Sequence, residues 1–237
     1  MGKNSTDEKI KELFAYLHSS TVCVLVSCIY FKGEWLDKFP LFTYKKQFHC
    51  VGDETAFVEM MSEKKNYPYT HDVNNKFKCV KINYKQRDYS MLIILPDLND
   101  GLDDVVKYVC ENGIEVPHNE VYLKLQIPKF QIKFGINLAS HLKTLGIEDA
   151  FKQSANFKKM TVSDKMHVSE VGHKSFIEVT EGEVVAATGT DTMQHSSLRK
   201  QSKPRQFIVN RPFVFVIKYN NLTLFMGKVN ALPDCES

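Results

Sequence analysis

Residues 173–213 read HKSFIEVTEGEVVAATGTDTMQHSSLRKQSKPRQFIVNRPF, and this stretch decides how the rest of the chain is interpreted. Residues 175–180 form a β-branched and aromatic run whose alternation is typical of a strand. From Glu181 the residues become small, then polar and basic, and apolar sequence resumes at Phe207. A connection of this length within a compact domain is normally functional or disordered. We therefore predict an exposed loop at about residues 181–205.

The loop has a two-residue periodicity. Every second residue from Gly182 to Ser196 is uncharged, whereas Glu181, Glu183 and Asp191 fall in the other register. Because side chains alternate between the two faces of a strand, the loop is suited to joining a sheet with its uncharged register buried. No unpaired charge would then enter the core.

The sequence after the loop resembles the signature of a known family. Residues 207–217, FIVNRPFVFVI, fit the serpin signature, and the loop itself is similar to the serpin reactive-centre loop. Further motifs occur in the order found in that family: VLVSCIYFKGEW (24–35), VEMM (58–61), MLIILPD (91–97), IPKF (127–130), LGI (145–147) and LFMGKV (224–229). The resemblance covers nearly the whole chain. It implies an α+β fold: one serpin-like, multi-sheet domain over residues 1–237 with an exposed reactive-centre loop.

Compared with a full serpin, the chain is expected to be N-terminally truncated by roughly a third of the domain or more. The nearly continuous apolar strand expected at residues 22–31 requires cover on both faces and would have an open edge. Three interpretations remain: the domain is completed by another segment, the chain is a truncated product, or it is a reduced variant.

The composition of the chain and the motifs that it lacks argue against several classes of protein. The net charge of +3 does not indicate nucleic-acid binding. We expect no signal peptide, because the first residues contain no apolar run, and no membrane span, because no apolar run is long enough. The six cysteines lack a Cys-x-x-Cys spacing and read as free thiols. Residues 97–101 resemble the start of a calcium loop, but the distal glutamate is missing. We expect no metal or cofactor.

The sequence also lacks local signatures of catalysis. It has no phosphate-binding glycine loop, no His-Glu-x-x-His motif and no Gly-x-Ser-x-Gly elbow. We therefore expect that the chain is not an enzyme. We also expect it to be a monomer. The breadth of the family favours an extracellular location, whereas the unpaired cysteines favour the cytoplasm as the alternative.

Periodicity predicts the remaining elements. Helices are expected at residues 6–17, 102–110 and 136–145, strand segments within 48–61, and strands at 76–84, 89–95, 121–134, 212–219 and 222–229. Residues 62–69 are expected to be a polar, lysine-rich connection.

The resemblance implies a trapping mechanism. A serine protease would cleave the loop, and the freed segment would insert as an extra strand before the acyl bond is hydrolysed. The hinge of this movement would comprise Glu181, Gly182, Glu183, Val184, Ala186, Ala187 and Thr188. Glu183 stands where the family usually has glycine, and Val184 where it usually has threonine. A non-inhibitory serpin-like binding protein or an inactive truncated variant is therefore the alternative.

Two cleavage sites are candidates. The family spacing from Glu181 places the scissile bond at Ser197-Leu198, whereas the chemistry of Arg199-Lys200 suits a trypsin-like protease, whose specificity pocket holds a carboxylate. The basic residues Arg199, Lys200, Lys203 and Arg205 are also candidates for contact with a polyanion, or they form a solvated basic loop.

Three residues match positions that control opening of the serpin sheet. Ser27 stands where an asparagine usually neighbours the histidine that corresponds to His173, and Trp35 closes the same central motif. A serine hydroxyl can hydrogen-bond to an imidazole. The alternative for Ser27 and His173 is a packed core pair.

Overall fold

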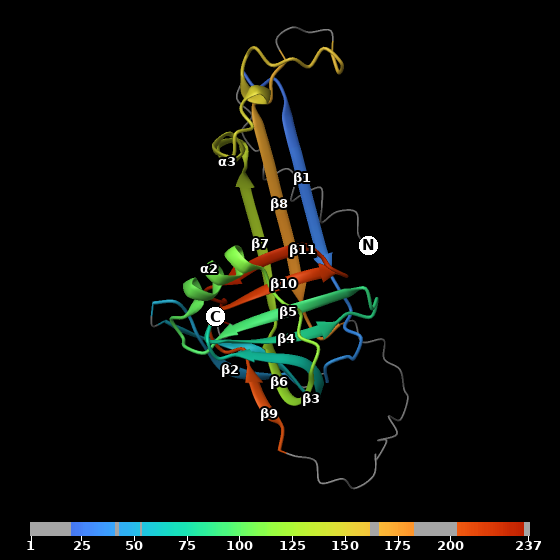
Figure 1. The fold of residues 1–237 in the computed structure, drawn as a ribbon, viewed down its shortest axis with the longest axis vertical. Coiled ribbons are helices and arrows are strands. Elements are labelled where there is room, and N and C mark those ends of the chain that lie inside the picture. Colours follow the sequence, from blue (N-terminus) through green and yellow to red (C-terminus); the bar gives the residue numbers. More distant parts are fainter. Residues whose placement is uncertain (1–19, 41–42, 53, 162–165, 183–202, 235–237) are drawn as a thin grey trace. The chain divides into compact units, whose positions relative to one another are not determined.

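The computed structural model describes residues 20–40, 43–52, 54–161, 166–182 and 203–234 (Figure 1). The chain forms two compact units: Met1–Lys32 with Gln131–Glu178, and Gly33–Phe130 with Val179–Ser237. We call them the first and the second unit. The expected single domain over residues 1–237 stays a prediction, and the helix expected at residues 6–17 lies outside the described residues.

The second unit is built on an eight-stranded sheet. Its strands are β2 (Tyr44–His49), β3 (Thr55–Asp72), β4 (Phe77–Asn83), β5 (Tyr89–Pro96), β6 (Glu120–Pro128), β9 (Arg205–Ile208), β10 (Phe213–Tyr219) and β11 (Leu222–Val229). They follow the order β11-β10-β5-β4-β3-β6-β9, and β2 pairs with β3 outside this path. The strands predicted at residues 76–84, 89–95, 212–219 and 222–229 are confirmed as β4, β5, β10 and β11, and they form the antiparallel pairs β4–β5 and β10–β11.

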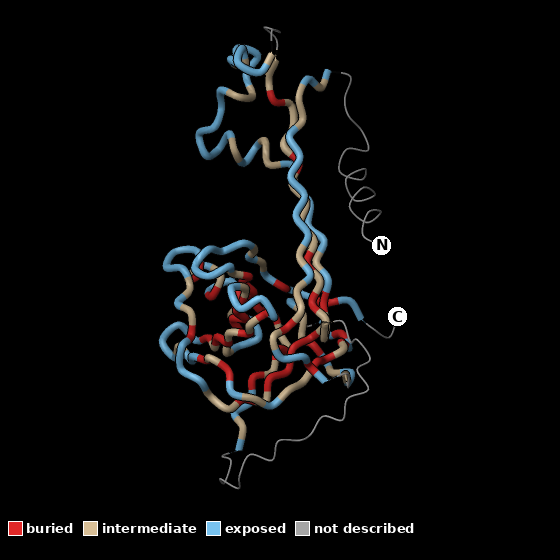
Figure 2. Tube along the Cα trace, turned by 90° about the vertical axis from the view of Figure 1, so that its right-hand side faces the viewer, coloured by how far each residue is buried: buried red, intermediate tan, exposed pale blue. Residues whose placement is uncertain are grey.

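The core of the second unit lies against this sheet. Helix α2 (Leu102–Asn112) covers β4, β5 and β10 by packing Leu102, Val105 and Val109 onto them. Buried residues of β4, β5 and β10 complete this cluster, and Figure 2 colours the buried segments of the chain red. Cys79 belongs to this core, and burial raises the pKa of its thiol to about 12. The free thiols among the described residues are Cys23, Cys28, Cys50, Cys79 and Cys110.

The first unit has a three-stranded sheet in the order β1-β8-β7, formed by β1 (Val24–Lys32), β8 (Glu170–Val179) and β7 (Phe130–Asn137). β1 and β8 are parallel, and their register runs from Val24 opposite Glu170 to Lys32 opposite Glu178. The consecutive residues Leu25 and Val26 are 50% and 48% exposed. Because they face opposite sides of β1, the described residues leave both faces partly open, although a parallel apolar strand normally needs cover on both.

Three elements differ from the sequence prediction. Residues 62–69 are not a connection but part of β3, because residues 62–68 pair with β6 and Tyr69 pairs with Val80 of β4. The strand expected at residues 121–134 is two strands, β6 and β7, separated by Lys129 and belonging to different sheets. The helix expected at residues 136–145 shortens to α3 (Ala139–Thr144), which has no buried residue to stabilise further turns.

We predict that Gly227→Ala destabilises the second unit. A Cβ at this position would lie 2.7 Å from two ring carbons of Phe215, which is 1% exposed. Overpacking of this kind costs about 1–3 kcal/mol of unfolding free energy, measurable by urea unfolding. Met226→Ala, a change at a neighbouring exposed residue, should cost less than about 0.5 kcal/mol. Equal losses in the two variants would contradict this packing argument.

Candidate functional site

The start of the predicted loop is held by a buried tryptophan. The indole Nε1–H of Trp35 donates to the carbonyl oxygen of Thr180 at 2.7 Å. Trp35 is 2% exposed, and its ring stacks on Tyr84 with 4.5 Å between the ring centroids. The ring of Phe39 packs edge-on against the same indole, with 5.9 Å between the ring centroids. Because this aromatic cluster fixes the indole, its N–H presents a rigid donor to the backbone one residue before Glu181.

An ion-pair cluster holds the next residue of the loop. Lys129, between β6 and β7, places its Nζ 2.5 Å from Oε1 of Glu181 and 2.9 Å from Oε2 of Glu59 on β3. The backbone N–H of Lys129 also donates to the carbonyl oxygen of Glu59 at 2.8 Å. Burial alone would lower the pKa of Lys129, but hydrogen bonds to the two carboxylates outweigh it and raise the pKa. We call Glu59, Lys129 and Glu181 the clasp.

The end of the loop is held by backbone pairing. β9 runs parallel to β6 in a register that places Arg205 beside Leu123 and Phe207 beside Leu125. Phe207 is buried, and the guanidinium of Arg205 lies 5.6 Å from the ring centroid of Tyr69 on β3. This contact is a cation–π interaction. Arg205 thus belongs to the sheet, whereas Lys203, two residues earlier, is exposed.

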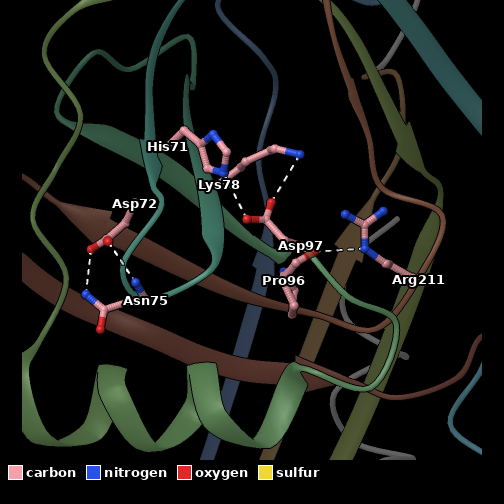
Figure 3. Close-up of polar contacts among 7 residues, drawn as sticks. All are labelled: His71, Asp72, Asn75, Lys78, Pro96, Asp97 and Arg211. Atoms are coloured by element: carbon pink, nitrogen blue, oxygen red, sulfur yellow. Dashed lines mark hydrogen bonds and ion pairs between the residues drawn. The ribbon is translucent and has the colours of Figure 1, made fainter.

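A second polar cluster follows β9 (Figure 3). Nε of Arg211 donates to the carbonyl oxygen of Pro96 at 2.8 Å, and burial lowers the pKa of this arginine. The next residue, Asp97, lies 2.9 Å from Nε2 of His71 and 3.1 Å from Nζ of Lys78. Burial on its own would raise the pKa of Asp97, but hydrogen bonds with His71 and Lys78 outweigh it and lower the pKa. The turn after β5 is thereby tied both to the β3–β4 hairpin and to the segment that enters β10.

The structure places other predicted residues as follows. Ser27 and His173 are partners in the β1–β8 register, but their side chains form no hydrogen bond with each other. Ser27 is exposed and His173 is intermediate, so neither is part of a core. Gly182 has a φ of +98°, a backbone conformation that favours glycine. The remaining hinge residues and candidate cleavage sites lie outside the described residues: Glu183, Val184, Ala186, Ala187, Thr188, Ser197, Leu198, Arg199 and Lys200.

Sequence reasoning missed the partners of the loop ends. Lys129 lies in the IPKF motif, but its contact with Glu59 joins residues that are distant in the sequence. The same is true of Pro96 and Arg211, whose hydrogen bond joins the end of β5 to the segment before β10, its neighbour in the sheet. The sequence analysis placed Lys129 inside one strand, so it offered no signal for the two carboxylates.

Comparison with known proteins decides the family. The model of the family described as "Serpin (serine protease inhibitor)" matches residues 1–232. The chain belongs to the serpin family. Serpin B4 of Homo sapiens is 33% identical over 97% of this chain, and Leukocyte elastase inhibitor A of Mus musculus is 33% identical over 96%. The solved structure of Serpin48 from the insect Tenebrio molitor superposes on 93% of the chain with a TM-score of 0.75 and 29% identity.

These matches confirm the predicted fold class, a serpin-like α+β fold with several sheets and few helices. The chain spans 61% and 63% of the length of the two serpin relatives and 58% of the insect serpin chain. No helix in the described residues combines the length and the apolar character needed to cross a bilayer.

We predict that the clasp contributes measurably to stability. Lys129→Met leaves the carboxylate of Glu181, whose side chain is only 12% exposed, without its cation. The expected loss is about 1–2 kcal/mol of unfolding free energy, whereas Glu181→Gln should cost under about 1 kcal/mol because Lys129 keeps Glu59. Urea unfolding of both single variants and of the double variant gives the coupling energy. As a control, Lys85→Met removes the exposed pair with Glu34 and should change nothing measurable. A coupling energy of zero between Lys129 and Glu181 would contradict the clasp.

The lowered pKa of Asp97 predicts a pH-dependent contribution to stability. Because the folded-state pKa lies below the unfolded value of about 3.9, the stabilisation is complete above that pH and is lost as the pH falls through the folded pKa. Asp97→Asn should therefore cost about 1 kcal/mol near neutral pH and progressively less below about pH 4. Urea unfolding at several pH values measures this difference. Asp88→Asn, at an exposed turn residue, is the control; the same pH-independent loss in both variants would show that Asp97 has no special role.

Proposed function

We propose that the chain forms the loop-bearing part of a serine protease inhibitor that acts as a suicide substrate. The membership in the serpin family and the relative named as an elastase inhibitor support protease inhibition. The observation that carries the mechanism is the parallel pairing of β1 with β8, because β8 leads directly into the loop.

The strand directions define where a cleaved loop would insert. A segment that turns back at Gly182 runs antiparallel to β8, and therefore also antiparallel to β1. Placed between the two strands, it would replace one parallel ladder by two antiparallel ladders, which are slightly more stable per residue. β1 and β8 share nine register pairs, from Val24 to Lys32. About nine inserted residues, spanning about 30 Å, would fill this length before the basic segment at Arg199 is reached.

The alternation of the loop supports the same movement. Val184, Ala186 and Thr188 belong to the uncharged register and would share one face of the inserted strand. The charged residues Glu183 and Asp191 would share the opposite face. The inserted strand would thus have one face suited to burial and one suited to solvent.

The target that we propose is a trypsin-like serine protease. The dipeptide Arg199-Lys200 offers basic side chains to a specificity pocket that contains a carboxylate. Cleavage at Ser197-Leu198, which the family spacing favours, is the second candidate. The inhibitor would act as an extracellular monomer without a cofactor, with the cytoplasm as the alternative location, and its exposed Lys203 would contact polyanions together with Arg199, Lys200 and Arg205.

A non-inhibitory serpin-like binding protein is the second candidate function. It is favoured by the hinge, where Glu183 and Val184 depart from the glycine and threonine usual in the family. Valine is stiff at χ1 and slows a backbone rearrangement that a smaller residue would allow. In this candidate the loop is cleaved without insertion, or it is never cleaved.

We predict that the full chain mixed with an equal amount of trypsin gives a covalent complex that survives boiling on a denaturing gel. Mass spectrometry of the released C-terminal peptide identifies the cleaved bond, because the peptide begins at Leu198 or at Lys200. Complete cleavage without any complex would overturn the proposal that the chain is an inhibitor. If the thermal stability of the cleaved chain also did not rise, the result would favour the non-inhibitory binding protein.

A matched pair of variants tests insertion itself. Ala186→Glu places a charge in the uncharged register and should abolish the complex while leaving cleavage intact, because the charge would have to be buried. Ala187→Glu adds the same charge one residue later, in the register that faces solvent, and should retain the complex. Equal behaviour of the two variants would show that the loop does not enter a sheet with this register.

A further inference from the structure

The outer edge of β1 is open in the described part of the chain. β1 is the last strand of its three-stranded sheet, where it pairs with β8. Its other edge carries backbone N–H and C=O groups that pair with no described strand, and such an edge can template the addition of a further strand. The register with β8 is continuous, so no bulge twists this edge away. Residues 24–31 are all uncharged, so no charge blocks the edge either.

β1 exposes apolar side chains on both of its faces. Val22, Leu25, Val26, Ile29 and Tyr30 are between 42% and 52% exposed. Val26 and Tyr30 lie on one face of the strand, whereas Leu25 and Ile29 lie on the other. A strand added at the edge would cover part of both faces at once, because its own side chains alternate in the same way. The matching occupant is therefore an extended segment that is apolar on both faces, and a second copy of β1 is such a segment.

The sequence of β1 is suited to pairing with itself. Two copies that run antiparallel overlap along all nine residues, Val24–Lys32, when the two-fold axis passes through the midpoint, Cys28. In this register, Cys28 lies opposite the Cys28 of the second copy. Tyr30 lies opposite Val26 of the second copy, which is a favourable pair of an aromatic and a β-branched residue. The symmetry produces this pair twice.

The charges at the two ends of the strand are complementary in the same register. Lys32 lies opposite Val24 of the second copy, whose neighbour on β8 of that copy is Glu170. Lys32 and Glu170 would be two strand spacings apart, or about 10 Å, on the same face, a distance that a lysine and a glutamate side chain can bridge together. Within the described part of the chain, Glu170 forms no ion pair. The dimer would thus supply a cation to this carboxylate at each end.

We propose that the chain forms a two-fold symmetric dimer by antiparallel pairing of β1 with the β1 of a second copy. The two three-stranded sheets become one continuous sheet in the order β7-β8-β1-β1-β8-β7. Because both edges of β1 are then paired, β1 can separate from β8 only by carrying the second copy with it. The dimer is therefore a resting form of the monomeric inhibitor, and this last step alone rests on the function proposed above.

Sedimentation velocity of the full chain at about 1 to 100 μM measures the association. Cys28→Glu puts two carboxylates opposite each other on the axis, although each lies beside Lys174 of its own chain. It should weaken the dimer by about fivefold or more. The control, Cys110→Glu, adds the same charge at an exposed position of α2 and should change the affinity by less than about twofold. Equal losses in the two variants would reduce the effect to net charge and overturn the proposal, as would an unmodified chain that stays monomeric.

A mixture of two variants tests the position of the axis. Cys28→Lys should also associate weakly by itself, because it places two ammonium groups on the axis. An equal mixture of Cys28→Lys and Cys28→Glu should associate more tightly than either variant alone, since only the mixed dimer pairs opposite charges there. Melting curves verify that both variants are folded. A mixture that associates no better than the separate variants would overturn the register.

Oxidation provides a direct readout of the same contact. Diamide should link two copies through Cys28: the two thiols form an S–S bond, and their two protons and two electrons reduce the N=N bond of diamide. Residues directly opposite each other on antiparallel strands are close enough for a disulfide. Peptide mapping should identify the Cys28–Cys28 link, and Cys28→Ser should abolish it. Dimers linked mainly through other cysteines would overturn the proposal.

Two further arms separate edge pairing from the loop and from the proposed function. Ala186→Glu should dimerise as tightly as the unmodified chain; a weaker dimer would mean that the loop of one copy enters the sheet of the other, which would overturn edge pairing. The Cys28-linked dimer should form the complex with trypsin more slowly than the Cys28→Ser chain, and equal rates would overturn the resting form. Absence of a complex from both would refute the proposed function, whereas sedimentation would still decide the dimer.

Discussion

The two ends of the predicted loop are held by interactions of different kinds, and this asymmetry bears on how the loop could move. The start depends on side chains: one indole N–H on Thr180 and one ammonium group, that of Lys129, shared between Glu59 and Glu181. The end depends on a backbone ladder between β9 and β6 and on the burial of Phe207. A partly exposed ion pair contributes about 1 kcal/mol or less, whereas a buried aromatic side chain contributes about 1.5–3 kcal/mol in addition to its ladder. The loop can therefore be released at its start while its end remains in the sheet.

β3 connects these features because it is 18 residues long and pairs with β2, β4 and β6. Its odd-numbered residues include Glu59 of the clasp and Tyr69, which contacts Arg205 at the end of the loop. Its even-numbered residues include Lys64, which lies opposite Lys124 of β6. Because a strand sends successive side chains to opposite faces, one element supports the loop on one side and presents a separate charged surface on the other.

The sequence predicted the structure correctly where neighbouring residues carry the signal. The β4–β5 hairpin and α2 combine apolar periodicity with clear turns, and the motifs of residues 207–217 identify the family without a structure. Local signals failed for residues 62–69, whose lysines suggest a connection, since only pairing with β6 and β4 keeps the chain extended. They also failed at Lys129, where the alternation continues although the chain passes from one sheet to another. The clasp depends on that passage, so its carboxylates could not be found from spacing alone.

The energetics of insertion depend on burial more than on hydrogen bonds. An inserted strand would add one net hydrogen bond for about each residue, worth about 0.5–1.5 kcal/mol, while ordering the residue costs about 1–2 kcal/mol. These terms nearly cancel, so the apolar contacts of Val184 and Ala186 must supply the driving force. They can do so only where one face of the sheet is covered, and among the described residues Leu25 and Val26 leave both faces of β1 half exposed. In the proposed mechanism, a segment that covers one face of β1 would supply this burial, and the uncharged register of the loop would occupy the covered face.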